Sequence, residues 1–175
     1  MTASNLATAF AGVPLAAQAQ VDSPVGPLTL LATARGLAGL WFDAQKYHPG
    51  ELDAPVNAKQ AHIAAAIAWL GAYWEKRETA STKVALDLHG TGFQRAVWKA
   101  LLEIPHGGTR TYGEIASRAG KADAARAAGA AIGRNPVGII VPCHRVIGRD
   151  GSLTGYAGGL ERKLALLQLE GVMLT

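Results

Sequence analysis

The chain has 175 residues, of which 49% are hydrophobic, and carries a formal net charge of +4 with a single cysteine; it can therefore bury a real core as one domain, or as a small and a medium one. No apolar run reaches 18 residues, and Met1–Ala34 lacks Lys and Arg, so we expect neither a membrane-spanning helix nor a signal peptide. One cysteine excludes an internal disulfide and a multi-cysteine zinc site, and it suits a soluble protein of the reducing cytoplasm.

The first half of the chain predicts an antiparallel meander followed by a helix. Short runs at Ala17–Asp22, Leu28–Thr33 and Leu37–Phe42 predict strands, because turn-forming residues separate them. Apolar residues recur at helical spacing through Ala58–Arg77, which predicts a helix packed on this sheet. A further strand is predicted at Val84–Leu88. No pattern in this half indicates a chemical site.

The second half predicts three short helices with tight joints, which is typical of a helix-turn-helix arrangement. Capping-box patterns begin at Thr91 and at Thr111, and a third helix is predicted over Asp123–Ile132. That third helix is almost all alanine around Arg126. Small side chains let a helix backbone approach another surface closely, and we interpret that surface as DNA. The alternative is that alanine is simply the best helix former and the helix is packed inside.

Positive charge is concentrated in the second half. Residues 91–175 carry 11 basic and 6 acidic side chains, whereas residues 1–90 carry 6 and 7. A basic half favours a polyanionic partner approached from one face, although scattered positive charge is also a common means of staying soluble.

The single thiol lies in Pro142-Cys143-His144-Arg145, directly after the apolar run Val137–Val141. We expect this run to be buried and extended and to hold the cysteine rigidly. A neighbouring imidazole or guanidinium lowers a cysteine pKa and favours the nucleophilic thiolate. The alternative is a small buried hydrophobic residue without chemistry. The tetrapeptide alone leaves both interpretations open.

The stretch from Arg134 to Gly148, including this tetrapeptide, closely resembles the active-site signature of the O6-alkylguanine-DNA alkyltransferases, the methylated-DNA–protein-cysteine methyltransferases. The resemblance runs without a gap from about Thr91 to Gly171. It implies an α/β (α+β) chain in two domains. Residues 1–90 would form a sheet-plus-helix, ribonuclease-H-like domain, and residues 91–175 a winged-helix-like helical domain that binds DNA and accepts the alkyl group.

The resemblance implies direct-reversal DNA repair, in which a methyl or small alkyl group moves irreversibly from O6 of guanine to Cys143, with O4 of thymine as a second candidate source. Adjacent side chains on an extended strand point apart, so His144 is expected to act on the sulfur through a water. Glu170 would orient His144, which implies a lowered pKa for the thiol. Asn135 would brace the turn before the active-site strand, and Arg145 would be structural.

The target carbon lies inside the stacked duplex, so the nucleotide must be flipped into a pocket. By resemblance, Arg126 fills the vacated space, and Tyr112 rotates the 3′ phosphate and donates a proton to guanine N3. The remaining implied contacts with DNA come from Ala127, Ala128 and Gly129.

The implied substrate pocket comprises the backbone of Cys143 and Val146, the loop Tyr156-Ala157-Gly158, and Lys163, a candidate for steering the anionic substrate. Many relatives have serine where Ala157 stands, so only its backbone N–H is expected to face the alkylated oxygen. The implied partner is double-stranded DNA containing O6-alkylguanine, with no membrane, no cofactor, no metal and a monomeric state in solution.

Three other functions would require different sequence features. A damage sensor that flips the base without reacting would lack the cysteine. A transcription regulator would carry Arg, Asn or Gln on its recognition helix to read base edges, where this chain offers chiefly alanine. A cysteine hydrolase usually needs a separate histidine after the nucleophile, and none follows His144.

Overall fold

The computed structural model describes residues 9–77, 79 and 83–174. The chain divides into two compact units, Met1–His89 and Gly90–Thr175. Within the described part of the chain, no helix is long and apolar enough to cross a membrane.

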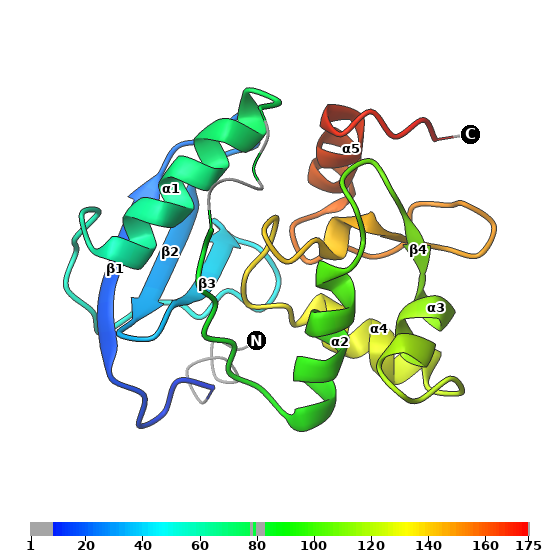
Figure 1. Ribbon diagram of the computed structural model, residues 1–175, viewed down its shortest axis with the longest axis horizontal. Helices are drawn as coiled ribbons and strands as arrows, with labels where there is room; N and C mark the ends of the chain where they lie inside the picture. The colour runs from blue at the N-terminus through cyan, green and yellow to red at the C-terminus, as the bar shows by residue number, and fades with distance from the viewer. Residues whose placement is uncertain (1–8, 78, 80–82, 175) are drawn as a thin grey trace. The chain divides into compact units, whose positions relative to one another are not determined.

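The N-terminal unit is a three-stranded antiparallel sheet with one helix packed on it (Figure 1). The strands β1 (Leu15–Val21), β2 (Leu28–Thr33) and β3 (Leu37–Phe42) pair in chain order, with β2 in the centre. Helix α1 (Ala61–Trp74) contacts all three strands. Every residue of β2 and β3 is buried, in keeping with their mainly apolar sequences. The predicted meander and helix are confirmed, each within three residues of its observed bounds.

The predicted strand at Val84–Leu88 is wrong. Only Leu86 forms a bridge, a parallel one, to Leu37. Leu37 donates its N–H to the Ala85 carbonyl at 2.8 Å, and the Asp87 N–H donates to the Leu37 carbonyl at 2.9 Å. The Asp87 carboxylate accepts hydrogen bonds from the side chains of Thr33 and His89. These are side-chain contacts and do not extend the pairing of strands. The backbone pairing between this segment and β3 therefore ends after one residue, Leu86.

The C-terminal unit is built on four α-helices and one short 3-10 helix in its described residues (Figure 1). Helices α2 (Gly92–Leu102), α3 (Tyr112–Arg118) and α4 (Ala125–Gly133) pack against one another. The 3-10 helix η1 (Cys143–Arg145) contacts both α2 and α5 (Leu160–Leu169). The three predicted helices and the helical fold class of this unit are confirmed.

Both predicted capping boxes are present and set where α2 and α3 begin. Thr91 Oγ1 accepts from the Gln94 N–H at 3.1 Å while Gln94 Oε1 accepts from the Thr91 N–H at 2.9 Å. Thr111 and Glu114 exchange the same pair of bonds. Each box satisfies two N–H groups that a helix start leaves without partners. The second box makes Tyr112 the first residue of α3.

A two-stranded parallel sheet was not predicted. Strand β4 (Arg110–Thr111) pairs with β5 (Val146–Ile147). Strands of two residues leave no periodic signal in a sequence. Their pairing nevertheless joins the start of α3 to the segment that follows η1, and so brings Tyr112 toward the cysteine.

Candidate active site

Cys143 opens the short helix η1, so the extended active-site strand predicted from the apolar run is wrong. The run Val137–Val141 is buried except for the partly exposed Ile140, but it folds as consecutive turns. The Val141 N–H closes a turn on the Val137 carbonyl at 3.0 Å. Ile139 adopts φ of +69°, a left-handed conformation that β-branched residues rarely take. Such strain persists only where the surrounding structure fixes it.

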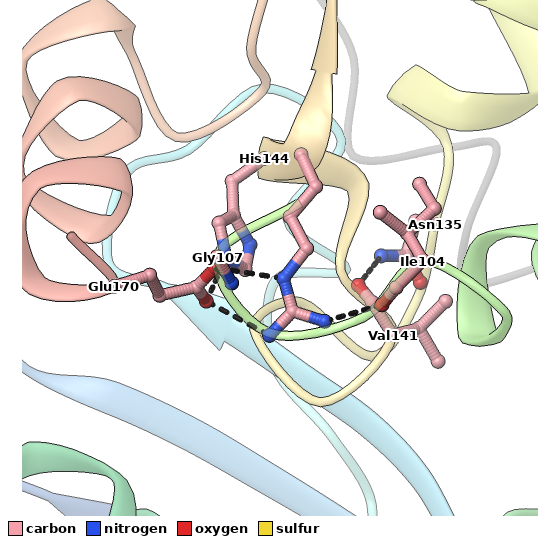
Figure 2. A network of polar contacts seen from close by, with 7 residues as sticks. Ile104, Gly107, Asn135, Val141, His144 and Glu170 are labelled. Carbon is pink, nitrogen blue, oxygen red and sulfur yellow. Dashed lines mark hydrogen bonds and ion pairs between the residues drawn. The ribbon is translucent and has the colours of Figure 1, made fainter. Parts of the chain in front are cut away.

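Asn135 braces these turns, as the sequence predicted. Its Nδ2 donates to the Val141 carbonyl at 2.8 Å, and its Oδ1 accepts from the Val137 N–H at 3.0 Å. Figure 2 shows the first of these bonds beside the polar cluster at Glu170. Asn135 also acts on Cys143, where it favours the thiolate and opposes the effect of burial on the thiol pKa. One buried amide thus holds the turns together and influences the thiol.

Glu170 follows α5 as its C-cap and sits fully buried between His144 and Arg145 (Figure 2). Its Oε1 lies 2.7 Å from His144 Nε2. Arg145 donates to both carboxylate oxygens, at 2.8 and 2.9 Å, and to the Ile104 carbonyl at 2.7 Å. The predicted pairing of Glu170 with His144 is therefore present. Arg145 completes a bidentate ion pair, which matches the structural part predicted for it.

These contacts set the charges of the pair. Burial alone would raise the pKa of Glu170, but the hydrogen bonds from His144 and Arg145 outweigh it and hold that pKa well below its ordinary value. Burial lowers the pKa of His144 despite the nearby carboxylate. A neutral imidazole beside an ionised carboxylate carries its hydrogen on Nε2.

His144 Nδ1 is consequently left as a bare acceptor. It is buried and has no hydrogen-bond partner within the described ranges. A buried acceptor without a partner is costly and normally has a functional reason or a water beside it. The imidazole is held as a base whose free lone pair is available for a proton.

Burial raises the pKa of the Cys143 thiol, against the opposing effects of Asn135, Lys163 and backbone hydrogen bonds. The lowered pKa inferred from the sequence is therefore wrong for the protein without substrate. The reason is desolvation: Cys143 is 7% exposed, and a buried thiolate loses the water that would solvate it. The resting thiol is neutral.

Lys163 is fully buried, so the surface role that the sequence suggested, steering an anionic substrate, is wrong. Its Nζ donates to the carbonyls of Thr154, at 2.7 Å, and Gly155, at 3.2 Å. Burial lowers the pKa of Lys163 to about 8, while Cys143 favours its charged form. Lys163 is a buried cation that acts electrostatically on the thiol.

Helical spacing could have indicated that burial. Lys163, Leu166, Leu167 and Glu170 stand at positions i, i+3, i+4 and i+7, which share one face of a helix. All four are buried. Because Glu170 was predicted to lie in the site, this spacing places Lys163 on the same buried face of the helix.

Tyr112 bonds to a residue that sequence reasoning did not single out, Thr154. The Tyr112 hydroxyl donates to the Thr154 carbonyl at 3.0 Å, and Thr154 Oγ1 donates to the Tyr112 oxygen at 3.2 Å. The Tyr112 ring lies against α4 at Gly129, where an added Cβ would sit 3.6 Å from it. That distance is an ordinary van der Waals contact, so the tyrosine packs directly on α4 at this position. No local pattern marks Thr154, because its partner is 42 residues away.

The outward face of α4 is made of Arg126, Ala127 and Ala130, which are all exposed. Ala128 is fully buried, so its predicted contact with DNA is wrong for the side chain. In a helix, residue 128 points away from residues 126 and 130 and here packs inward. Ala130 takes its place on the exposed face.

The other predicted pocket residues lie around the same cluster. Val146, in β5, is fully buried, and Tyr156, Ala157 and Gly158 are partly buried in the loop before α5. Their contacts with a base stay a prediction. Across the described ranges, no three His, Cys, Asp or Glu side chains lie together as a metal site requires.

Comparison with known proteins identifies close relatives of both units. The model of the 6-O-methylguanine DNA methyltransferase DNA-binding domain matches residues 92–172, and that of the ribonuclease-like domain of the same proteins matches residues 18–88. A methylated-DNA–protein-cysteine methyltransferase of Mycobacterium bovis is 51% identical over 150 residues, covering 86% of this chain and 89% of the relative. One of Methanosarcina barkeri is 48% identical, covering 86% and 94%.

Solved structures agree with these matches. The O6-methylguanine methyltransferase of Mycobacterium tuberculosis superposes with a TM-score of 0.75 at 48% identity, covering 87% of this chain and 91% of that one. The structure of Mycobacterium tuberculosis OGT in complex with DNA superposes with a TM-score of 0.77 at 47% identity, covering 88% and 92%.

The buried carboxylate generates a prediction about stability. Because the folded-state pKa of Glu170 is depressed, its contribution to stability is complete above its ordinary pKa of 4.5 and is lost as the pH falls below that value. We expect Glu170→Gln to lower the free energy of unfolding by about 3 kcal/mol at pH 7, because it leaves Arg145 buried without its partner. The difference from the unsubstituted protein should shrink between pH 4.5 and 3.

Urea unfolding at pH 3 to 7 measures this difference. Glu161→Gln, at an exposed carboxylate in the first turn of the same helix, is the matched control and should change stability by less than about 0.5 kcal/mol. A Glu170→Gln difference that stays constant across this pH range would contradict the assignment of an ionised, buried carboxylate.

Proposed function

Because this chain belongs to the 6-O-methylguanine DNA methyltransferase family, we propose that it repairs DNA by taking the alkyl group of O6-alkylguanine onto Cys143. Repair by alkyl transfer from DNA to a cysteine is what the chain's relatives are named for. Cys143 is the only cysteine of the chain. The position of Cys143 carries the assignment. It lies next to His144, whose Nε2 is bonded to the buried carboxylate of Glu170.

The chemistry requires a strong nucleophile at an sp3 carbon. The sulfur attacks the alkyl carbon as its bond to O6 breaks, and the electron pair of that bond passes into the guanine. The product thioether is stable, and no second cysteine exists to remove the alkyl group. Each molecule therefore reacts once, with no cofactor.

The charges at the site determine where the proton of the thiol goes. The resting thiol is neutral, so its proton must leave as the sulfur attacks. His144 Nδ1 is the base that takes it, through a bridging water, because Nε2 is committed to Glu170. The carboxylate steadies the imidazolium that forms, in the manner of a hydrolase triad. A neutral resting thiol is also protected from oxidation until substrate arrives.

Double-stranded DNA is the proposed partner, approached by the outward face of α4. Arg126 is exposed on this face among alanines, which let the helix backbone come close to the duplex. A flipped guanine leaves a gap in the stack, and we assign Arg126 to that gap. The proposal extends to O4-alkylthymine, to a protein monomeric in solution and to a cytoplasmic location.

The flipped base would lie between η1, the loop of Tyr156 to Gly158, and Tyr112. Guanine's amino group would donate to the carbonyls of Cys143 and Val146, and the Ala157 N–H would face O6. The Tyr112 hydroxyl would donate its proton to N3 as charge develops on the departing guanine, which is general-acid assistance.

Intact mass is the direct test of the proposed function. After incubation with an excess of duplex oligonucleotide containing O6-methylguanine, the protein should gain one methyl group per molecule and then stop, because nothing regenerates the thiol. Peptide mapping should place the group on Cys143. Repeated turnover, or equal methylation of Cys143→Ala, would rule out direct transfer to this residue.

The part assigned to Arg126 predicts a difference between two substrates. Arg126→Ala should slow repair of duplex DNA about tenfold or more, since unstacking a base costs a few kcal/mol, yet leave repair of free O6-methylguanine nearly unchanged. Lys99→Ala, which removes one positive charge from an exposed position of α2, is the control for charge alone. Equal losses on both substrates would show that Arg126 acts elsewhere.

The part assigned to His144 predicts a pH dependence. His144→Ala should slow single-turnover transfer about a hundredfold or more at pH 7, because the neutral thiol loses its base. Since burial raises the pKa of Cys143, the deficit should ease as the pH rises toward 9 and hydroxide takes over the deprotonation. Duplex affinity should change by less than about twofold, as His144 is fully buried.

His62→Ala, at a partly exposed histidine of α1, is the control and should leave the pH profile unchanged. A His144→Ala deficit that is the same at pH 6 and pH 9 would mean that His144 braces the fold instead of accepting the proton.

A further inference from the structure

The Tyr112 hydroxyl makes two hydrogen bonds to one residue. It donates to the carbonyl oxygen of Thr154, and it accepts from the Thr154 hydroxyl. Lys163 Nζ donates to the same carbonyl oxygen at 2.7 Å. Thr154 therefore joins the first residue of α3 to the buried lysine of α5, whose charge also acts on Cys143.

The two donors on one carbonyl oxygen allow Tyr112 to change its partner at little cost. A carbonyl oxygen has two lone pairs, and here each has its own donor. When the Tyr112 hydrogen turns to another acceptor, the Thr154 oxygen keeps the bond from Lys163 and is not left unsatisfied. Exchanging one hydrogen bond while the other remains costs less than losing both.

The Thr154 hydroxyl acts in the opposite direction, on the phenol oxygen itself. It donates a hydrogen to that oxygen, and a hydrogen bond to an ionised acceptor is shorter and stronger than one to a neutral acceptor. The bond therefore strengthens as the phenol gives up its proton. An interaction that strengthens during the reaction accelerates it, whereas one of constant strength does not.

We propose that Thr154 is a positioning residue for proton donation by Tyr112, and that Lys163 holds the Thr154 carbonyl while the donation takes place. The proposal rests on the proposed function, in which Tyr112 is the acid. As the C–S bond forms and the C–O6 bond breaks, the electron pair enters the guanine and the Tyr112 proton moves to N3. The tyrosinate keeps the hydrogen bond from Thr154 until solvent returns a proton, which balances the one taken by His144.

Lys163 fits this part because of what surrounds it. Among the residues that the structure describes, no carboxylate forms an ion pair with Lys163. Its hydrogen bonds go to the carbonyls of Thr154 and Gly155. A buried ammonium that donates to backbone carbonyls fixes the loop that carries them, and its positive charge favours the thiolate of Cys143.

The test is a double-mutant cycle between Thr154 and Tyr112, measured as single-turnover methyl transfer from a duplex. Thr154→Val removes the hydroxyl at nearly constant shape and keeps the carbonyl. It should slow transfer about tenfold in the protein with Tyr112 and should slow it no further in a Tyr112→Phe background, where no phenol remains to assist. Thr154→Ser keeps a hydroxyl at this position and should therefore keep the rate of the unsubstituted protein.

Other outcomes would overturn the proposal. Equal slowing by Thr154→Val in both backgrounds would show that Thr154 shapes the loop and not the acid, and an unchanged rate in the Tyr112 background would show that the hydroxyl is idle. If Val disturbs the loop, as a lowered melting temperature would reveal, Thr154→Ala removes the same hydroxyl and is subject to the same criteria. The unsubstituted protein run alongside separates this question from the proposed function, since failure of methyl transfer to Cys143 there would refute the function itself.

Discussion

The buried carboxylate of Glu170 is the constraint on which the C-terminal unit's site depends. It is the C-cap of α5, yet it receives hydrogen bonds from two consecutive residues of η1 and lies near the N–H of Gly107 at 3.4 Å. A full negative charge can be buried only where it is paired and fully hydrogen-bonded. Satisfying Glu170 therefore fixes η1 against α5, and with η1 it fixes the orientation of His144 and the place of Cys143.

The same burial explains why the site holds its nucleophile in reserve. Desolvation raises the thiol pKa and lowers that of His144, so the pair rests as a neutral acid and a neutral base instead of an ion pair. A protein that uses its thiol once gains from this arrangement, since premature oxidation would consume it. Activation is then coupled to substrate, because the thiol becomes a stronger acid only as its sulfur attacks the alkyl carbon.

The residues proposed to assist the leaving group are also held in place by contacts between distant parts of the chain. Pairing of β4 with β5 sets the start of α3 beside the segment after η1, and the Thr154 loop connects Tyr112 to Lys163. The Tyr112 ring lies against α4 at Gly129. The residue proposed to assist the departing guanine is therefore in contact with the helix proposed to face the duplex, so small residues in α4 serve packing as well as the proposed approach to DNA.

The sequence by itself determined the features that depend on neighbours within one or two turns of chain. The capping boxes at Thr91 and Thr111, the helices they start and the apolar meander follow from such local rules, and the signature around Cys143 identified the family. Tertiary structure alone decided the rest. The run Val137–Val141 folds as turns and not as a strand, Ala128 points inward, and the thiol pKa is raised. The burial of Ala128 and of the thiol is a sum over the whole fold that no local pattern contains. Glu170 and Tyr112 bond to partners that lie 25 to 42 residues away along the chain.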